Sequence, residues 1–132
     1  MLVQALLDWM QNSAADHTGT FAALSQPTAQ NLPPWQDSVF VEWHGRWKNR
    51  LQQDGQPAAL VSARMQAHNP AVIPRNHAVE AALQAAANGD LTPCHSPLAG
   101  LKAPYDFQRH RPSDLTAPPP AEAPPYRTFC GT

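Results

Sequence analysis

A chain of 132 residues can support one small hydrophobic core, and only 14% of its residues are charged. Its formal net charge is -1 and its 9 Lys and Arg residues are scattered, so it lacks the basic patch of a nucleic-acid-binding protein. No apolar run approaches the roughly 18 to 20 residues that span a bilayer, and the start lacks the features of a signal peptide. We therefore expect a cytoplasmic protein with neither nucleic acid nor membrane as a partner.

The first part of the chain predicts two helices. A helix from about Leu2 to Asn12 follows from apolar residues that recur three and four positions apart, namely Val3, Leu6, Leu7 and Met10. Asp16 or Thr18 is suited to cap a second, short helix that carries Phe21 and Leu24. Prolines at 27, 33 and 34 then require a connecting segment.

The strongest periodic segment predicts a helix from about Gln36 to Asp54, with Gly55 as its C-cap. Its stripe has a four-residue spacing and is rich in aromatic side chains: Val39, Trp43, Trp47 and Leu51, with Phe40 beside them. Two tryptophans at this spacing can form a stacking platform for a ligand, but on an apolar stripe the spacing favours a buried core.

Two more helices are expected before residue 91. One starts at Pro57, contains Leu60, Val61, Arg64 and Met65, and stops at Asn69-Pro70. The next follows Pro74, contains Val79, Ala82, Leu83 and Ala86, and stops at Asn88-Gly89. Asn76 is expected to cap this helix, and Arg75 to pair with a carboxylate.

These elements predict an all-α fold, a small irregular helical domain of about four to six helices, because no comparable segment alternates with period two. Nine of the 15 prolines fall between Pro93 and Pro125, so we divide the chain into a helical region, 1–91, and a proline-rich tail, 92–132. Ser96-Pro97 can start a short helix in the tail. The later prolines favour polyproline II, either as an arm on another surface or as a disordered tail.

Three segments carry a resemblance to a known family: Asp16 to Leu24; Arg64-Met65 followed by Asn69-Pro70-Ala71-Val72-Ile73-Pro74-Arg75-Asn76-His77; and the terminal Tyr126-Arg127-Thr128-Phe129-Cys130-Gly131-Thr132. They resemble the C-terminal portion of the selenoprotein O (SelO/YdiU) protein adenylyltransferases, with Ala22 where an arginine is usual. The resemblance implies a pseudokinase-fold enzyme that uses ATP and Mg²⁺ to transfer AMP to Ser, Thr or Tyr hydroxyls of proteins.

The ATP-handling part of such an enzyme is not found in this sequence. Its six glycines form no phosphate-binding pattern, and its only lysines are Lys48 and Lys102. We therefore assign no catalytic, cofactor-binding or metal-binding residue, and expect the chain to bind no cofactor itself. The six histidines also lack zinc-site spacing, and we interpret them as surface or capping residues.

Cys130 is the one residue for which we predict a functional role, as a redox-active thiol. It lies two positions from the end of the sequence. The resemblance implies that it pairs with a cysteine of the kinase-like core and couples redox state to activity, while the proline-rich arm returns to that core. Cys94 could replace that partner only if the two α-carbons came within about 7 Å. The simpler interpretation of Cys94 is an incidental thiol in a loop.

Two functional classes follow. The first is a C-terminal fragment of a SelO-like adenylyltransferase, inactive alone, whose partner is the kinase-like core in the same or another chain. Whether this chain counts as an enzyme then depends on that core. The alternative is a stand-alone helical protein-interaction module or a gene relic. Both predict exposed apolar surface.

Overall fold

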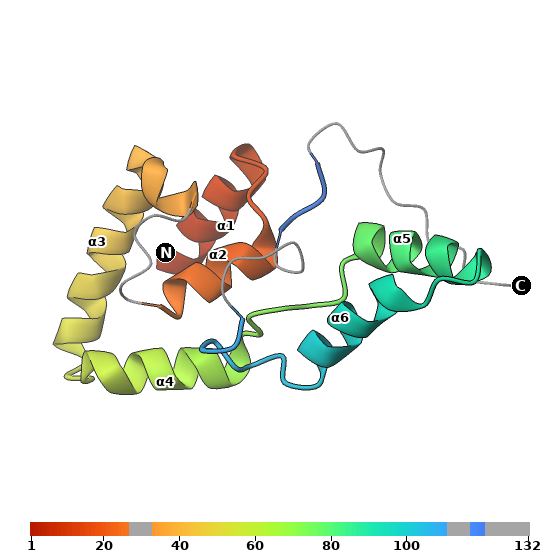
Figure 1. Ribbon diagram of the computed structural model, residues 1–132. Helices are drawn as coiled ribbons and strands as arrows, with labels where there is room; N and C mark the ends of the chain where they lie inside the picture. Colours follow the sequence, from red (N-terminus) through yellow and green to blue (C-terminus); the bar gives the residue numbers. More distant parts are fainter. Residues whose placement is uncertain (27–32, 111–116, 121–132) are drawn as a thin grey trace, which may run out of the picture. The chain divides into compact units, whose positions relative to one another are not determined.

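A computed structural model describes residues 1–26, 33–110 and 117–120 (Figure 1). Regular structure in these residues is helical throughout, which confirms the all-α prediction. The elements are α1 (Leu2–Asn12), α2 (His17–Leu24), the 3-10 turn η1 (Pro33–Gln36), α3 (Ser38–Gln53), α4 (Ala58–His68), α5 (Asn76–Ala87) and α6 (Thr92–Leu101).

The chain forms two compact units, Met1–Ala71 and Val72–Thr132. The first contains α1 to α4 and the second contains α5 and α6. The predicted boundary at residue 91, which rests on a change in composition, stays a prediction. Much of the predicted tail, including Cys130, lies outside the described residues.

Aspartates start α2 and α3. The Gly19 amide donates to Asp16 Oδ2 at 2.6 Å, so the structure selects Asp16 rather than Thr18 as the cap of α2. Asp37 Oδ1 accepts from the amides of Val39 at 2.8 Å and Phe40 at 3.3 Å, and α3 therefore begins two residues after the predicted Gln36. In both cases a carboxylate pairs with first-turn amides that have no partner within the helix.

Helices α1, α3 and α5 end in the same hydrogen-bonded turn, in which the residue after the C-cap takes a left-handed conformation. This residue is Gly55 after α3, with a φ of 65°, and Gly89 after α5, with a φ of 87°. Both glycine stop signals are thereby confirmed. After α1 the position is held by Ala14, with a φ of 49°, and the Ala15 amide donates to the Met10 carbonyl at 2.9 Å.

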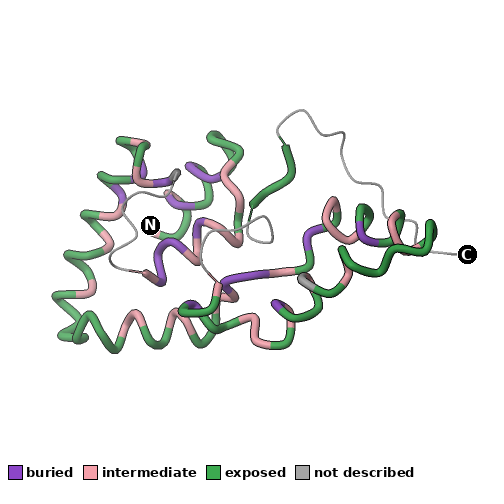
Figure 2. Tube along the Cα trace, in the orientation of Figure 1, coloured by how far each residue is buried: buried purple, intermediate pink, exposed green. Residues whose placement is uncertain are grey.

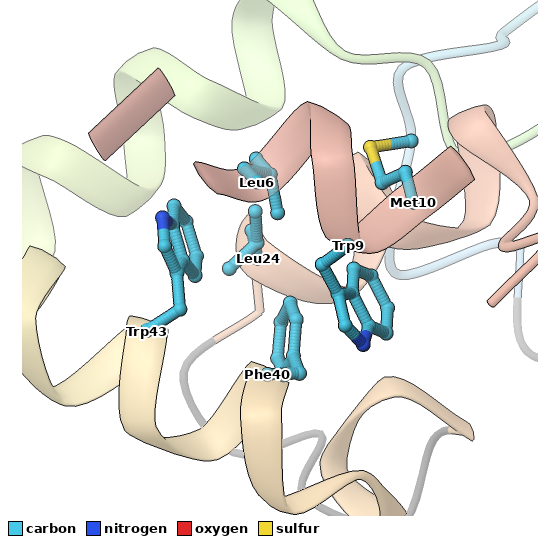
Figure 3. Close-up of a cluster of buried hydrophobic side chains, with 6 residues drawn as sticks. All are labelled: Leu6, Trp9, Met10, Leu24, Phe40 and Trp43. Carbon is cyan, nitrogen blue, oxygen red and sulfur yellow. The ribbon is translucent and has the colours of Figure 1, made fainter. Parts of the chain in front are cut away.

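The core of the first unit lies between α1, α2 and α3 (Figure 3). It consists of large buried side chains: Leu6, Trp9, Leu24, Phe40 and Trp43, which gather between the helices, and Met10, which lies to one side of them. Trp9 Nε1 donates to Asp37 Oδ2 at 2.9 Å, and Trp43 Nε1 donates to the Leu2 carbonyl at 2.8 Å. These bonds join the end of α1 to the start of α3 and the start of α1 to a later turn of α3, so the two helices run antiparallel.

The buried faces of α1 and α3 differ in part from the predicted stripes. Val3 and Leu7 are 68% and 43% exposed, while Trp9 joins Leu6 and Met10 in the core. On α3, Val39 is 60% exposed. A four-residue spacing advances by about 400° and so drifts around a helix that repeats every 3.6 residues. The face centred on Phe40 and Trp43 therefore leaves the first member of the stripe in solvent.

A polar joint connects α2 to α4. Ser25, the C-cap of α2, is fully buried. Its carbonyl accepts from Ser62 Oγ at 2.7 Å and from Gln66 Nε2 at 3.0 Å, and its hydroxyl accepts from Asn69 Nδ2 at 3.2 Å. Helix α4 itself has no buried residue, only exposed and intermediate positions (Figure 2). Helix α4 is thus attached to α2 by hydrogen bonds to Ser25 and not by a wide apolar face.

In the second unit α5 packs against α6. Helix α6 begins at Thr92, earlier than the predicted Ser96, because Asp90 Oδ1 accepts from the Thr92 amide at 2.9 Å and Pro93 fits the first turn. Pro97 consequently lies inside the helix. After α6, His110 Nε2 lies 2.8 Å from the Ala103 carbonyl, and Phe107 is buried.

Candidate functional site

The most distinctive side-chain cluster of the first unit surrounds His44. The Trp35 ring meets the imidazole edge-on with centroids 4.2 Å apart, Trp47 lies at 5.4 Å, and Phe40 is stacked at 6.2 Å. Burial among these rings lowers the pKa of His44 to about 4, and the charge of Lys48 acts in the same direction. At neutral pH the imidazole is therefore uncharged.

The helix repeat explains how this cluster forms. Phe40, His44 and Trp47 are separated by four and three residues, which places them on one face of α3. Trp35 reaches the same face from η1, directly before the helix. Our interpretation of the histidines as surface or capping residues is wrong for His44, which is half-buried. Its position four residues after Phe40 and three before Trp47 was the available signal.

The tryptophans of α3 are core residues, as predicted. Trp43 is buried, and Trp47 is half-buried and packs against the core. Their rings are stacked, with centroids 6.0 Å apart and planes 7° apart. Because Trp43 is only 4% exposed and its ring is stacked on that of Trp47, it offers no open face to a ligand.

Arg75 and Asn76 stand at the start of α5. Arg75 occupies the N-cap position, with extended backbone, and is only 9% exposed. Asn76 is the first helical residue and no side-chain cap bond is made at this position, so the predicted cap is wrong. A capping side chain must come from the residue before the helix, and that residue is Arg75. The expected ion pair of Arg75 stays a prediction.

Of the two cysteines, Cys94 is among the described residues and Cys130 is not. Cys94 lies in α6, not in the predicted loop; it is half-buried, and its Sγ is 3.5 Å from the Ala82 carbonyl. Cys130, the redox candidate, is outside the described residues, so its pairing remains a prediction. Within the described ranges no group of three or more His, Cys, Asp or Glu residues is placed to hold a metal ion.

None of the helices in the described residues has the length and apolar character needed to cross a membrane.

Comparison with known proteins gives consistent relatives. The chain is 44% identical to the protein nucleotidyltransferase YdiU of Syntrophotalea carbinolica, 45% to that of Alcanivorax borkumensis and 39% to that of Bacillus cereus. Each similarity covers 99% of this chain and 27% of the relative. No family model matches the chain, and neither does any solved structure. The chain therefore belongs to the YdiU protein nucleotidyltransferase family as a segment that spans 27% of its relatives' length.

Proposed function

We propose that this chain is a helical, non-catalytic part of a YdiU-type protein nucleotidyltransferase and that it contributes to activity only together with the rest of such an enzyme. The observation that carries the proposal is the combination of 39–45% identity over 99% of this chain with coverage of only 27% of each relative. The rest of the relatives' length is the natural location for the catalytic groups.

The placement of the glycines supports this division of roles. Gly19, Gly45 and Gly100 lie within α2, α3 and α6, and Gly55 and Gly89 follow the ends of α3 and α5. Those five serve helices or helix ends, whereas a phosphate cradle needs successive free amides in a glycine-rich loop. The two lysines, at 48 and 102, are both exposed.

The reaction that we propose for the assembled enzyme is transfer of AMP from ATP to Ser, Thr or Tyr hydroxyls of proteins, with magnesium. This step follows from the resemblance of three segments to the selenoprotein O family. The nucleotide and the metal would be held by groups outside this chain.

A chimera tests the proposal. This chain would replace the matching segment of the Syntrophotalea carbinolica relative, and transfer of labelled AMP to an acceptor protein would be measured with magnesium. We expect transfer by the chimera, none by the isolated chain, and little by the relative with the segment deleted. Transfer by the isolated chain that survives repurification contradicts the proposal, as does a folded but inactive chimera beside an active intact relative.

We also propose that Cys130 is a redox-responsive thiol of the assembled enzyme, in line with the resemblance of the last seven residues. Cys130→Ser should leave the helical circular dichroism of the isolated chain unchanged and remove the effect of oxidants on transfer by the chimera. A loss of helical signal would instead give Cys130 a structural role, and an unchanged oxidant response would exclude it as the sensor.

A stand-alone interaction module is the second candidate, and the self-contained packing of the first unit favours it. Two tryptophan hydrogen bonds and the Ser25 joint hold α1 to α4 together without any other chain. A chimera that folds no better than the deleted relative would favour this alternative.

A further inference from the structure

We propose that one edge of α1, formed by Val3 and Leu7, is the surface on which the rest of a YdiU-type enzyme packs. This inference rests on the proposed function and assigns a specific contact to it. We call these two residues the outer edge of α1.

The apolar arc of α1 is wider than its own unit covers. At about 100° per residue, the apolar positions of the helix span an arc of about 200°. In order around the helix they are Ala5, Trp9, Leu2, Leu6, Met10, Val3 and Leu7. The polar positions, Gln4, Asp8, Gln11 and Asn12, fill the opposite side without interruption. The core between α1, α2 and α3 covers the part of this arc from Ala5 to Met10, which is about 140° wide.

The structure shows where coverage stops along this arc. Leu6, Trp9 and Met10 are buried in the core of the first unit. The next two positions, Val3 and Leu7, are 68% and 43% exposed. They are four residues apart and therefore adjacent on the helix surface, so they form one continuous apolar edge beside the buried Met10.

Other exposed apolar residues of the first unit do not form such an edge. Val39 and Val41 of α3 are two residues apart and point to different sides of the helix. Leu60 of α4 is 42% exposed and has Arg64 one turn later on its face. Scattered apolar residues of this kind are normal on protein surfaces, whereas Val3 and Leu7 continue a buried helix face without a break.

The occupant that fits is the polypeptide making up the remaining three quarters or so of the relatives. The matched segment is 27% of each relative, so in those proteins it is covalently joined to a much larger body of chain. Contact with that body would complete the burial of an arc that begins in the core of this unit. A second copy of this chain is the competing occupant, which the experiment below distinguishes.

The test compares the double variant Val3→Gln/Leu7→Gln with the control Leu60→Gln. The control also replaces leucine by glutamine, and the exposed fraction of Leu60, 42%, is close to the 43% of Leu7. Each is made in the isolated 132-residue chain and in the Syntrophotalea carbinolica chimera. Melting temperature and gel-filtration volume are measured for all forms. Glutamine keeps helix propensity high, so the comparison reports loss of apolar contact.

Leu7 and Leu60 are 43% and 42% exposed, so each substitution should lower the melting temperature of the isolated chain somewhat. We expect the double variant to lower the melting temperature of the chimera by at least about 3 °C more than that of the isolated chain. The control should lower both by the same amount. An equal effect of the double variant on the two proteins, or an equal excess effect of the control in the chimera, overturns the inference while leaving the proposed function intact. A wild-type dimer of the isolated chain that the double variant dissociates also overturns it by naming a different occupant. A wild-type chimera that does not fold overturns the proposed function as well.

Discussion

Replacing Ala14 by glycine should stabilise the first unit. Ala14 has a φ of 49° at the position where α3 and α5 are followed by glycine. The Ala14 amide donates to the Gln11 carbonyl at 3.4 Å and the Ala15 amide to the Met10 carbonyl at 2.9 Å, so the turn that ends α1 requires the left-handed conformation.

The magnitude follows from two opposing terms. An L-residue in this conformation costs about 1–2 kcal/mol relative to the right-handed region. Glycine removes that cost but gives the unfolded chain more freedom, which costs about 0.4–1 kcal/mol. The net gain in the free energy of unfolding is about 0.5–1 kcal/mol. For a unit of this size, that corresponds to a rise in melting temperature of about 2–8 °C.

The assay is urea and thermal unfolding of the full chain, followed by the fluorescence of its tryptophans, which all lie in the first unit. Gly55→Ala is the matched control, because it places alanine in the same turn at a φ of 65°, where no neighbouring atom lies within 4 Å of the new methyl group. It should destabilise by a similar amount. An Ala14→Gly variant that is less stable than wild type, or a Gly55→Ala variant that is more stable, would refute the reasoning.

Three further predictions concern α3. Gly45→Ala should raise the free energy of unfolding by about 1 kcal/mol in urea unfolding, since Gly45 is an interior helical position with nothing within 4 Å of an added methyl group; a loss of stability would contradict this. Trp43→Phe should lower it by about 1–3 kcal/mol, because a smaller ring leaves space in the core and the bond to the Leu2 carbonyl is lost; an unchanged urea midpoint would show that the ring is not held as described. The pKa of His44 is about 4 in the folded state, below its ordinary value of 6.5, so the unfolded chain binds more protons between these values. Stability from this group is therefore present above pH 6.5 and lost as pH falls toward 4, and His44→Gln should flatten that part of the stability profile; an unaltered slope would exclude His44 as its source.

The sequence indicated some of the residues of the candidate site but not how they pack against one another. The spacing of Trp43 and Trp47 indicated a core helix, and both residues pack as predicted. The edge-on contact of Trp35 with His44 depends on the angle between η1 and α3, which no periodicity in either segment specifies. Cap assignments failed for a local reason at Asn76, where a shift of one residue gave the N-cap position to Arg75.

The sequence by itself determined the elements whose causes are local. The bounds of α1, and the stops at Gly55 and Gly89, follow from helical spacing and from the one residue type that takes a left-handed conformation without strain. Only the tertiary structure decided which side of α1 is buried and that Ser25 receives its bonds from α4. These features join residues up to 44 positions apart. Their energies depend on distances that exist only once the helices have packed.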